Sequence, residues 1–132
     1  PGLAGPPELL AAAGTAGVEV QLDIDGEELA LPAGVDLSAY RIIQEALTNV
    51  ARHAGPTSAQ LSIVYHSDQI AIAVVDEGGR KWDRPRPDPA RSGHGLVGMR
   101  ERAALYGGDL TAGPHGHGFE VHATLPTKEP LG

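Results

Sequence analysis

The stretch RIIQEALTNVARHA, residues 41–54, decides the fold more than any other part of the chain. Its apolar residues recur every three or four positions, at Ile42, Ile43, Ala46, Leu47 and Val50. This spacing is the period of a helix with one buried face. It predicts a helix over residues 37–54, with Asp36 or Ser38 as N-cap and the Gly-Pro pair at 55–56 as the stop.

Alternating apolar and polar residues predict strands before and after this helix. Residues 18–24 read VEVQLDI, the two-residue period of a half-buried strand, and Asp25-Gly26 closes it as a turn. Residues 61–65 and 70–75 form two further strands. The short HSDQ segment between them, and the β-branched residues of the second, predict antiparallel neighbours.

The last third of the chain shows the same two periods. The apolar residues of 95–106 lie on one face of a predicted helix, and Gly107 is placed for its C-cap. Two closing strands follow, at 110–112 and 119–125. Elements in this order predict an α+β fold, a two-layer sandwich in which helices cover one face of a mixed, mostly antiparallel sheet.

One domain accounts for the chain, because 132 residues with 41% hydrophobic content suffice for a single core. We expect this domain at residues 18–126. A poorly defined segment, 1–17, with room for a short helix, precedes it, and a tail, 127–132, follows. Residues 77–92 carry several prolines without apolar periodicity, which is typical of a lid or of disorder.

The composition excludes several kinds of protein. A net charge of -7 argues against a general nucleic-acid binder. The lack of cysteine excludes disulfides, a thiolate metal site and a cysteine nucleophile, and fits a reducing, cytoplasmic compartment. No apolar run approaches the roughly 20 residues of a membrane span, and the start lacks the layout of a signal peptide. We therefore expect a soluble piece that is not itself embedded in a membrane.

A polar row lies beside the apolar stripe of the long helix. Glu45, Asn49 and His53 are spaced by four residues, with Arg52 next to the last. Carboxylate and amide oxygens are hard ligands suited to Mg²⁺ or its waters, and Arg52 and His53 could face phosphate oxygens. A solvated helix face has the same pattern, and the helix alone favours that interpretation.

Two other segments add features of a nucleotide site. Asp76 ends an apolar strand before two glycines, 78–79, so its carboxylate can accept from an amino-bearing ring while glycine backbone approaches closely. The GHG run at 93–95 opens the second long helix, where free N–H groups and the positive dipole end attract phosphates. Each segment alone is also compatible with an ordinary turn or helix start.

In this order, the three segments resemble the GHKL (Bergerat-fold) ATPases, and more closely the catalytic ATP-binding domain of NarL/DesK-type sensor histidine kinases. RIIQEALTNVARHA resembles the N box, VVDEGG at 74–79 the first glycine box, and SGHGLVGMRERAALYGG at 92–108 the second. The run GLVGMRER followed by Tyr-Gly-Gly is the most specific part. The resemblance covers roughly residues 37–126.

The resemblance implies a role for each matching residue, with ATP and Mg²⁺ as cofactors. Asn49 would ligate Mg²⁺, and Glu45 would orient the metal or its water; these two are the catalytic and metal assignments. Asp76 would accept a hydrogen bond from the adenine amino group. The other cofactor-binding residues would be Arg52 and His53 toward the phosphates, Gly78 in the first glycine box, and Gly93, His94, Gly95 and Leu96 in the phosphate-side loop.

One position departs from the family pattern. The first glycine box of the family usually reads Asp-x-Gly-x-Gly, and here Arg80 occupies the place of the last glycine. Either Arg80 points outward and leaves binding intact, or its bulk weakens the adenine side. The segment at 77–92 matches the ATP lid of the family, and its excess of positive side chains suits a triphosphate and a disordered surface insertion equally.

The implied activity needs a partner. The phosphate-accepting histidine of such kinases lies on a dimeric helical hairpin and is typically followed by an acidic residue, and none of the six histidines here precedes Asp or Glu. We expect His115, His117 and His122 to be exposed hairpin residues and not metal ligands.

The chain would transfer the ATP γ-phosphoryl group to a histidine on a separate dimerisation domain of the same receptor. From there the group would pass to a response regulator. The full-length parent would be a homodimer, either free in the cytoplasm or anchored in a membrane.

Two alternatives stay open. An anti-sigma-factor serine kinase shares the nucleotide boxes, although the GMRER-type second box argues against it. A nucleotide-binding or interaction module that has lost catalysis is supported by Arg80 alone.

Overall fold

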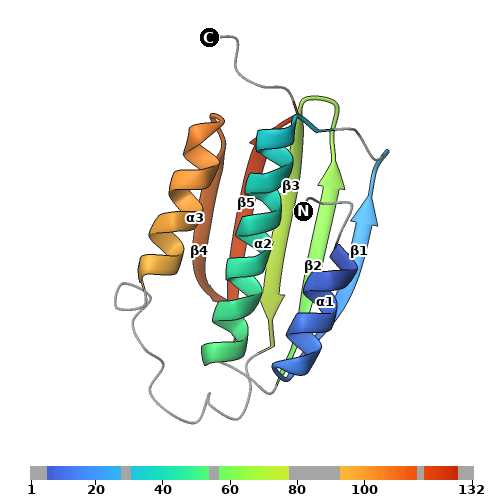
Figure 1. The fold of residues 1–132 in the computed structure, drawn as a ribbon, viewed down its shortest axis with the longest axis vertical. Coiled ribbons are helices and arrows are strands. Elements are labelled where there is room, and N and C mark those ends of the chain that lie inside the picture. Colours follow the sequence, from blue (N-terminus) through green and yellow to red (C-terminus); the bar gives the residue numbers. More distant parts are fainter. Residues whose placement is uncertain (1–5, 28–30, 54–56, 78–92, 116–117, 128–132) are drawn as a thin grey trace.

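The computed structural model describes residues 6–27, 31–53, 57–77, 93–115 and 118–127 of the chain. Figure 1 shows the helices and strands of these residues. They are, in chain order, α1 (Pro6–Thr15), β1 (Val18–Asp25), α2 (Ala33–His53), β2 (Thr57–Tyr65), β3 (Gln69–Asp76), α3 (Gly93–Leu105), β4 (Asp109–His115) and β5 (Gly118–Pro126). None of the helices in these ranges combines the length and apolar character needed to cross a membrane.

The strands form one mixed sheet in the order β1-β2-β3-β5-β4. Strands β1 and β2 are parallel, with Val18 opposite Thr57, and α2 is the crossover between them. All other neighbours are antiparallel, including β2 and β3, as their short connection predicts. The prediction of a mixed, mostly antiparallel sheet is therefore confirmed.

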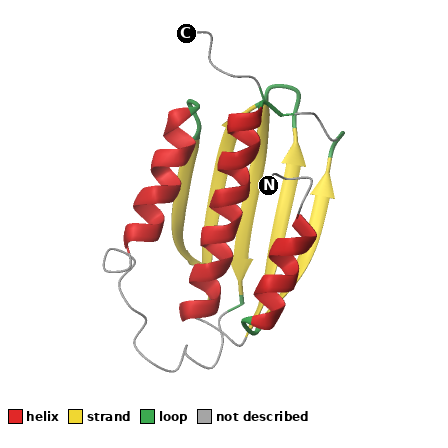
Figure 2. Ribbon diagram, in the orientation of Figure 1, coloured by secondary structure: helices red, strands yellow, loops and turns green. Residues whose placement is uncertain are grey.

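The three helices lie side by side on one face of the sheet, so the molecule has two layers (Figure 2). Helix α2 packs over the middle of the sheet, between α1 and α3, and contacts both. The predicted α+β two-layer sandwich is confirmed.

Burial along β3 follows the two-residue period of a strand with one face on the core. Ile70, Ile72 and Val74 are at most 2% exposed, and Asp76 continues the same alternation at 2% exposure. The strand thus ends by placing a carboxylate at a core-facing position. Such a group must interact with polar or charged partners, since burying a charge alone is costly.

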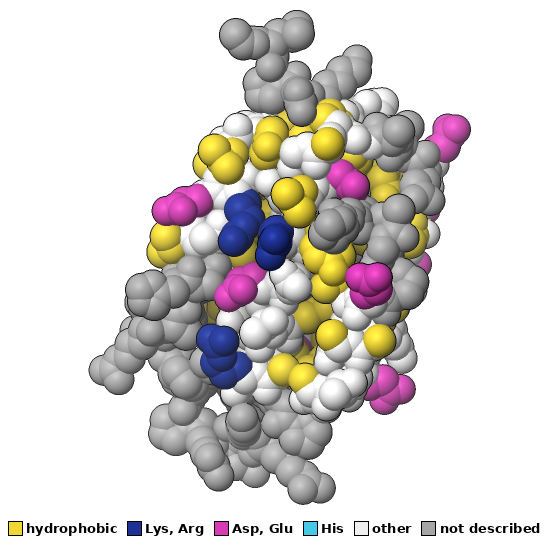
Figure 3. Space-filling view, in the orientation of Figure 1, with side chains coloured by type: hydrophobic (Ala, Val, Ile, Leu, Met, Phe, Trp, Pro, Cys, Tyr) yellow, Lys and Arg dark blue, Asp and Glu magenta, His cyan; other side chains and the backbone are white. Residues whose placement is uncertain are grey.

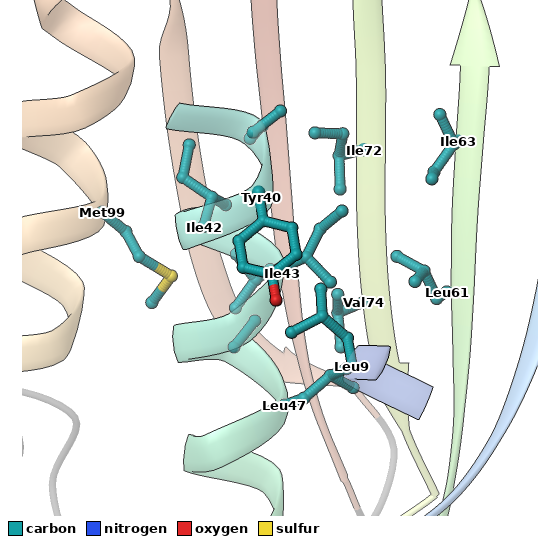
Figure 4. Packing of buried hydrophobic residues seen from close by; sticks show 14 of the residues in the cluster. Leu9, Tyr40, Ile42, Ile43, Leu47, Leu61, Ile63, Ile72, Val74 and Met99 are labelled. Carbon is teal, nitrogen blue, oxygen red and sulfur yellow. The ribbon is translucent and has the colours of Figure 1, made fainter. Parts of the chain in front are cut away.

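The core is the layer between α2 and the strands. Ile42, Ile43 and Leu47 point from α2 toward the sheet, and Met99 reaches the same layer from α3 (Figure 4). The strands contribute Leu61, Ile63, Ile72 and Val74 to this core, all at most 2% exposed. Burying each such side chain contributes about 1.5–3 kcal/mol, which fixes the position of α2 on the sheet.

The N-cap prediction for α2 is wrong. The helix begins at Ala33, where the N–H of Asp36 donates to the carbonyl oxygen of Pro32 at 2.9 Å. Asp36 therefore lies in the first turn, and Ser38 is a buried residue inside the helix. The cause is Val35, which is fully buried and extends the apolar stripe two residues before the predicted start.

The other boundaries lie within three residues of those predicted, except that β2 begins at Thr57, four residues before the predicted start. Helix α3 begins two residues before and ends one residue before the predicted range, and Gly107 has a φ of 78°, as a C-cap glycine requires. Gly26 has a φ of 86° and donates its N–H to Asp25 Oδ1 at 2.9 Å, which confirms the Asp-Gly turn.

Strand β1 is only partly the half-buried strand expected. Val18 is fully buried, but Leu22 is 36% and Ile24 46% exposed. Helix α1 has ten residues and is about 15 Å long, whereas the eight residues of β1 span about 26 Å. The helix therefore covers only the start of this edge strand.

Candidate functional site

Three elements place their functional ends at the same end of the molecule. Helix α2 finishes there at His53, β3 finishes there at Asp76, and α3 begins there at Gly93 (Figure 1). The three motifs of the sequence, far apart along the chain, are thus contributed to one region. At the ends of helices and strands, some backbone polar groups have no hydrogen-bond partner within the element, so they can bind a ligand.

Asn49 has the clearest chemical signature of this region. Its side-chain Oδ1 is buried, yet among the described residues it has no hydrogen-bond partner. A buried acceptor without a partner costs about 1–3 kcal/mol. Nearly every buried acceptor in a folded protein has a partner, and a ligand or an ion can be that partner.

Glu45 lies one turn before Asn49 on the same helix and is partly buried. Spacing by four residues puts the two side chains on one face of α2. A carboxylate and an open amide oxygen form a hard-oxygen donor pair, so these residues fit Mg²⁺ together with water and phosphate oxygens.

Asp76 presents its carboxylate at the edge of the core and not to open solvent. The backbone around it is held on one side by β2, since its Cα lies opposite Ala59 and the N–H of Glu77 donates to the Ser58 carbonyl oxygen at 3.1 Å. A buried carboxylate with a fixed orientation can select a ligand whose donor group points toward its oxygens.

The first turn of α3 contains no acidic residue. Its free N–H groups and positive dipole end are therefore not neutralised from within the helix, which favours an anion there. Gly93, His94, Gly95 and Leu96 all lie in this turn, as the second glycine box predicts, while their side chains are outside the described part.

The remaining predicted residues differ in what the structure describes. Arg52 lies in the last turn of α2 with an exposed side chain, and His53 ends the helix. On the helix-covered face, Lys and Arg side chains lie over α2 and α3 and not over α1 (Figure 3). Gly78, Arg80 and the rest of the predicted lid after Glu77 lie outside the described residues.

The histidines of the C-terminal hairpin form no metal site within the described residues, where no group of three His, Cys, Asp or Glu could hold an ion. His122 is exposed, and its Nε2 lies 3.3 Å from Glu120 Oε2. His115 ends β4, with its side chain outside the described part, as is all of His117.

Sequence reasoning missed one residue of this region, Gly118 at the start of β5. A Cβ added there would overlap the backbone carbonyl of Asp76 and lie 2.7 Å from its Oδ1. A glycine inside a strand is a recognised mark of close backbone approach, but Gly118 lies one residue before the predicted strand at 119–125. In the sequence this glycine passes for one more turn residue, because it belongs to a Gly- and Pro-rich run.

Comparison with known families identifies this arrangement. Residues 34–129 match the family described as Histidine kinase-, DNA gyrase B-, and HSP90-like ATPase. The matched range contains all of α2 except its first residue, the end of β3 and α3, and with them every predicted site residue. The chain therefore belongs to this ATPase family, which confirms the GHKL resemblance of the three sequence motifs.

Sequence relatives within the family carry the name of sensor kinases. The chain is 31% identical over 109 residues to Sensor histidine kinase LnrJ of Bacillus subtilis, covering 82% of this chain and 26% of that protein. It is 35% identical over 112 residues to Sensor histidine kinase YxjM of the same organism, covering 83% and 26%. The chain thus spans about a quarter of the length of these relatives.

Solved structures share the fold. The catalytic domain of histidine kinase ThkA aligns with a TM-score of 0.70 at 13% identity, covering 94% of each chain. Full-length ShkA in complex with AMPPNP aligns with a TM-score of 0.69 at 18% identity, covering 96% of this chain and 29% of that one. At these identities the likeness shows the fold alone.

Proposed function

We propose that this chain is the ATP-binding catalytic domain of a two-component sensor histidine kinase. It transfers the γ-phosphoryl group of ATP to a histidine on a separate dimerisation domain. The family supports the nucleotide, and the names of the relatives support the kinase. The single observation that carries the site is the buried, partnerless Oδ1 of Asn49 among the described residues.

Asn49 and Glu45 would hold Mg²⁺. When bound, the ion supplies charge neutralisation at the phosphate oxygens of the nucleotide. Asn49 Oδ1 gains the partner that the described residues do not provide, which offsets the cost of its burial. Glu45, one turn earlier on α2, would orient the metal ion or its bound water.

Asp76 would read the base. Adenine carries an amino group where guanine carries a carbonyl oxygen, so a buried carboxylate accepts from the first and repels the second. Because Asp76 is 2% exposed, water competes poorly for this hydrogen bond. The site therefore favours ATP over GTP.

The phosphates would lie between α2 and the start of α3. The N–H groups of the first turn, residues 93–96, donate to phosphate oxygens, and Arg52 and His53 add charge from the other side. The work of the domain is placement and charge stabilisation, as in other phosphoryl transfers. The bond from the γ-phosphorus to ADP breaks as the bond to the acceptor nitrogen forms.

The acceptor histidine belongs to another part of the parent protein. The chain covers about a quarter of its relatives, which leaves room in the parent for a dimerisation domain that carries this histidine. The phosphoryl group then passes to a response regulator. The GLVGMRER run supports the NarL/DesK-type subfamily for the parent. In this proposal the parent is a homodimer that carries this domain in the cytoplasm.

Isothermal titration with AMPPNP, with and without Mg²⁺, tests the site. We expect saturable binding that requires Mg²⁺ for full affinity. Absence of binding would remove both the proposal and the serine kinase alternative. Where binding occurs, mixing with the purified dimerisation domain of the parent and ATP should give acid-labile phosphohistidine. Acid-stable phosphoserine on another protein would instead favour the serine kinase.

A further inference from the structure

Gly118, the first residue of β5, lies against Asp76, the last residue of β3. Gly118 is buried, and a Cβ at this position would overlap the carbonyl oxygen of Asp76 and lie 2.6 Å from its carbonyl carbon. The same Cβ would lie 2.7 Å from the carboxylate Oδ1 of Asp76. Such distances are shorter than any ordinary carbon contact, so a side chain at 118 requires both groups to move.

The backbone at Asp76 has little room to retreat. On one side, β2 holds it through the pairing with Ala59 and the hydrogen bond from Glu77 to Ser58. On the other side, β5 is paired with β3 up to Val75 and Glu120, one residue before Asp76. A methyl group at 118 must therefore separate the two strand ends and displace the Asp76 carboxylate with them.

We propose that Gly118 is a positioning residue for base selection. By carrying no side chain, it allows the Asp76 carboxylate to occupy the place from which it accepts the adenine amino group. Gly118 itself does not contact the nucleotide in this scheme. The inference rests on the proposed function, because it requires that Asp76 reads the base.

Two other glycines provide matched controls. At Gly113 in β4, the strand that pairs with β5, a Cβ would meet nothing within 4 Å. At Gly108 a Cβ would overlap the carbonyl oxygen of Thr124, which resembles the overlap at Gly118 but lies at the opposite end of the sheet. The first substitution is neutral, and the second disturbs packing without touching Asp76.

The test compares Gly118→Ala, Gly113→Ala and Gly108→Ala with the unmodified domain. Affinities for AMPPNP and GMPPNP are measured by titration at 10 °C in trimethylamine N-oxide, which favours compact states, and folding is checked by circular dichroism. For Gly118→Ala we expect affinity for AMPPNP to fall about tenfold or more, as for a lost hydrogen bond to a charged group. Affinity for GMPPNP should change little, so that the preference for adenine narrows.

The two controls should keep the adenine preference, although Gly108→Ala should unfold at a lower temperature. A second measurement compares Asp76→Asn with the double variant Asp76→Asn, Gly118→Ala. If Gly118 acts through the carboxylate, the second substitution should not reduce the preference for AMPPNP over GMPPNP any further. Retention of the full preference by folded Gly118→Ala would overturn the inference. So would an unfolded Gly118→Ala beside a folded Gly108→Ala, because Gly118 would then serve the fold.

Failure of the proposed function gives a different result. An unmodified domain that binds neither nucleotide removes the function. An unmodified domain that binds AMPPNP with a preference that Gly118→Ala leaves unchanged removes only the role of Gly118.

Discussion

The two ends of the sheet use glycine and polar groups in opposite ways. At the end far from the site, Gly108 donates its N–H to Ala103 at 2.8 Å, Gly107 donates to Ala104 at 3.0 Å, and Gly26 donates to its neighbouring Asp25. These glycines close turns through bonds within the chain. At the site end, Gly118 makes room for a carboxylate, and Asn49 keeps a buried oxygen without a partner among the described residues.

The glycines at the far end therefore stabilise the fold, whereas the groups at the site end are arranged for a ligand. Substitutions at the far end should reduce stability and leave nucleotide selection unchanged. Substitutions at the site end should change nucleotide selection and leave stability unchanged. Three variants test this separation and a fourth, in α1, tests stability alone; they are considered in order of decreasing expected effect.

Gly26→Ala should have the largest effect. Gly26 has a φ of 86°, and an added Cβ would overlap the carbonyl oxygen of Tyr65. The strained backbone and the overlap together should lower the free energy of unfolding by about 2–4 kcal/mol. Urea unfolding followed by circular dichroism measures this change. Loss of the ATP-over-GTP preference in the folded variant would break the comparison.

Asn49→Asp should impair productive binding of Mg-ATP by about tenfold to a hundredfold, the range for polar groups that act on a metal site. The new carboxylate adds a negative charge beside the phosphates in a buried place. Thr48→Asp is the matched control, because the adjacent Thr48 is exposed and carries the same added charge away from that position. Calorimetric titration with Mg-AMPPNP distinguishes the two variants. Equal affinities in both would remove Asn49 from the site.

Asp76→Asn should weaken discrimination between adenine and guanine nucleotides by about tenfold, since one charge-assisted hydrogen bond loses its charge. The amide has the same size as the carboxylate, so the circular dichroism spectrum should stay unchanged. Competition between AMPPNP and GMPPNP for the folded variant gives the ratio. A ratio equal to that of the unmodified domain would show that another group reads the base.

Gly14→Ala should have the smallest effect. Gly14 lies in the last turn of α1, and an added Cβ would meet nothing within 4 Å. Alanine loses less conformational freedom than glycine in a helix, so the free energy of unfolding should rise by about 0.5–1 kcal/mol. Thermal unfolding checks the direction. A decrease would contradict the entropic account, because neither a steric overlap nor a positive φ opposes alanine at this position.

The fold could be predicted from the sequence wherever a local period was present. The apolar stripe of α2 and the alternation of β2 and β3 are visible in neighbouring residues, so their burial followed from the pattern. The start of α2 could not be placed, because it depends on Val35 reaching the core and not on the nearest capping residue.

The site divides along the same line. Asn49 and the start of α3 could be proposed from the sequence because their motifs are continuous and lie on helices. The contact of Gly118 with Asp76 could not be found in this way, since it depends on the alignment of two strands that are far apart in the chain. Neither residue alone signals the other.

The connections between strands also set the order in which the site can be assembled. A turn of three residues joins β2 to β3, where the His66 N–H donates to Gln69 at 2.8 Å, so this hairpin closes a very short loop. Strand β5 reaches β3 only after α3 and β4 have been added, across a much longer stretch of chain. During refolding we therefore expect Asp76 to acquire its backbone partners on β2 early, and to acquire Gly118 late. The ability to tell adenine from guanine would then be among the last properties that the folding domain gains.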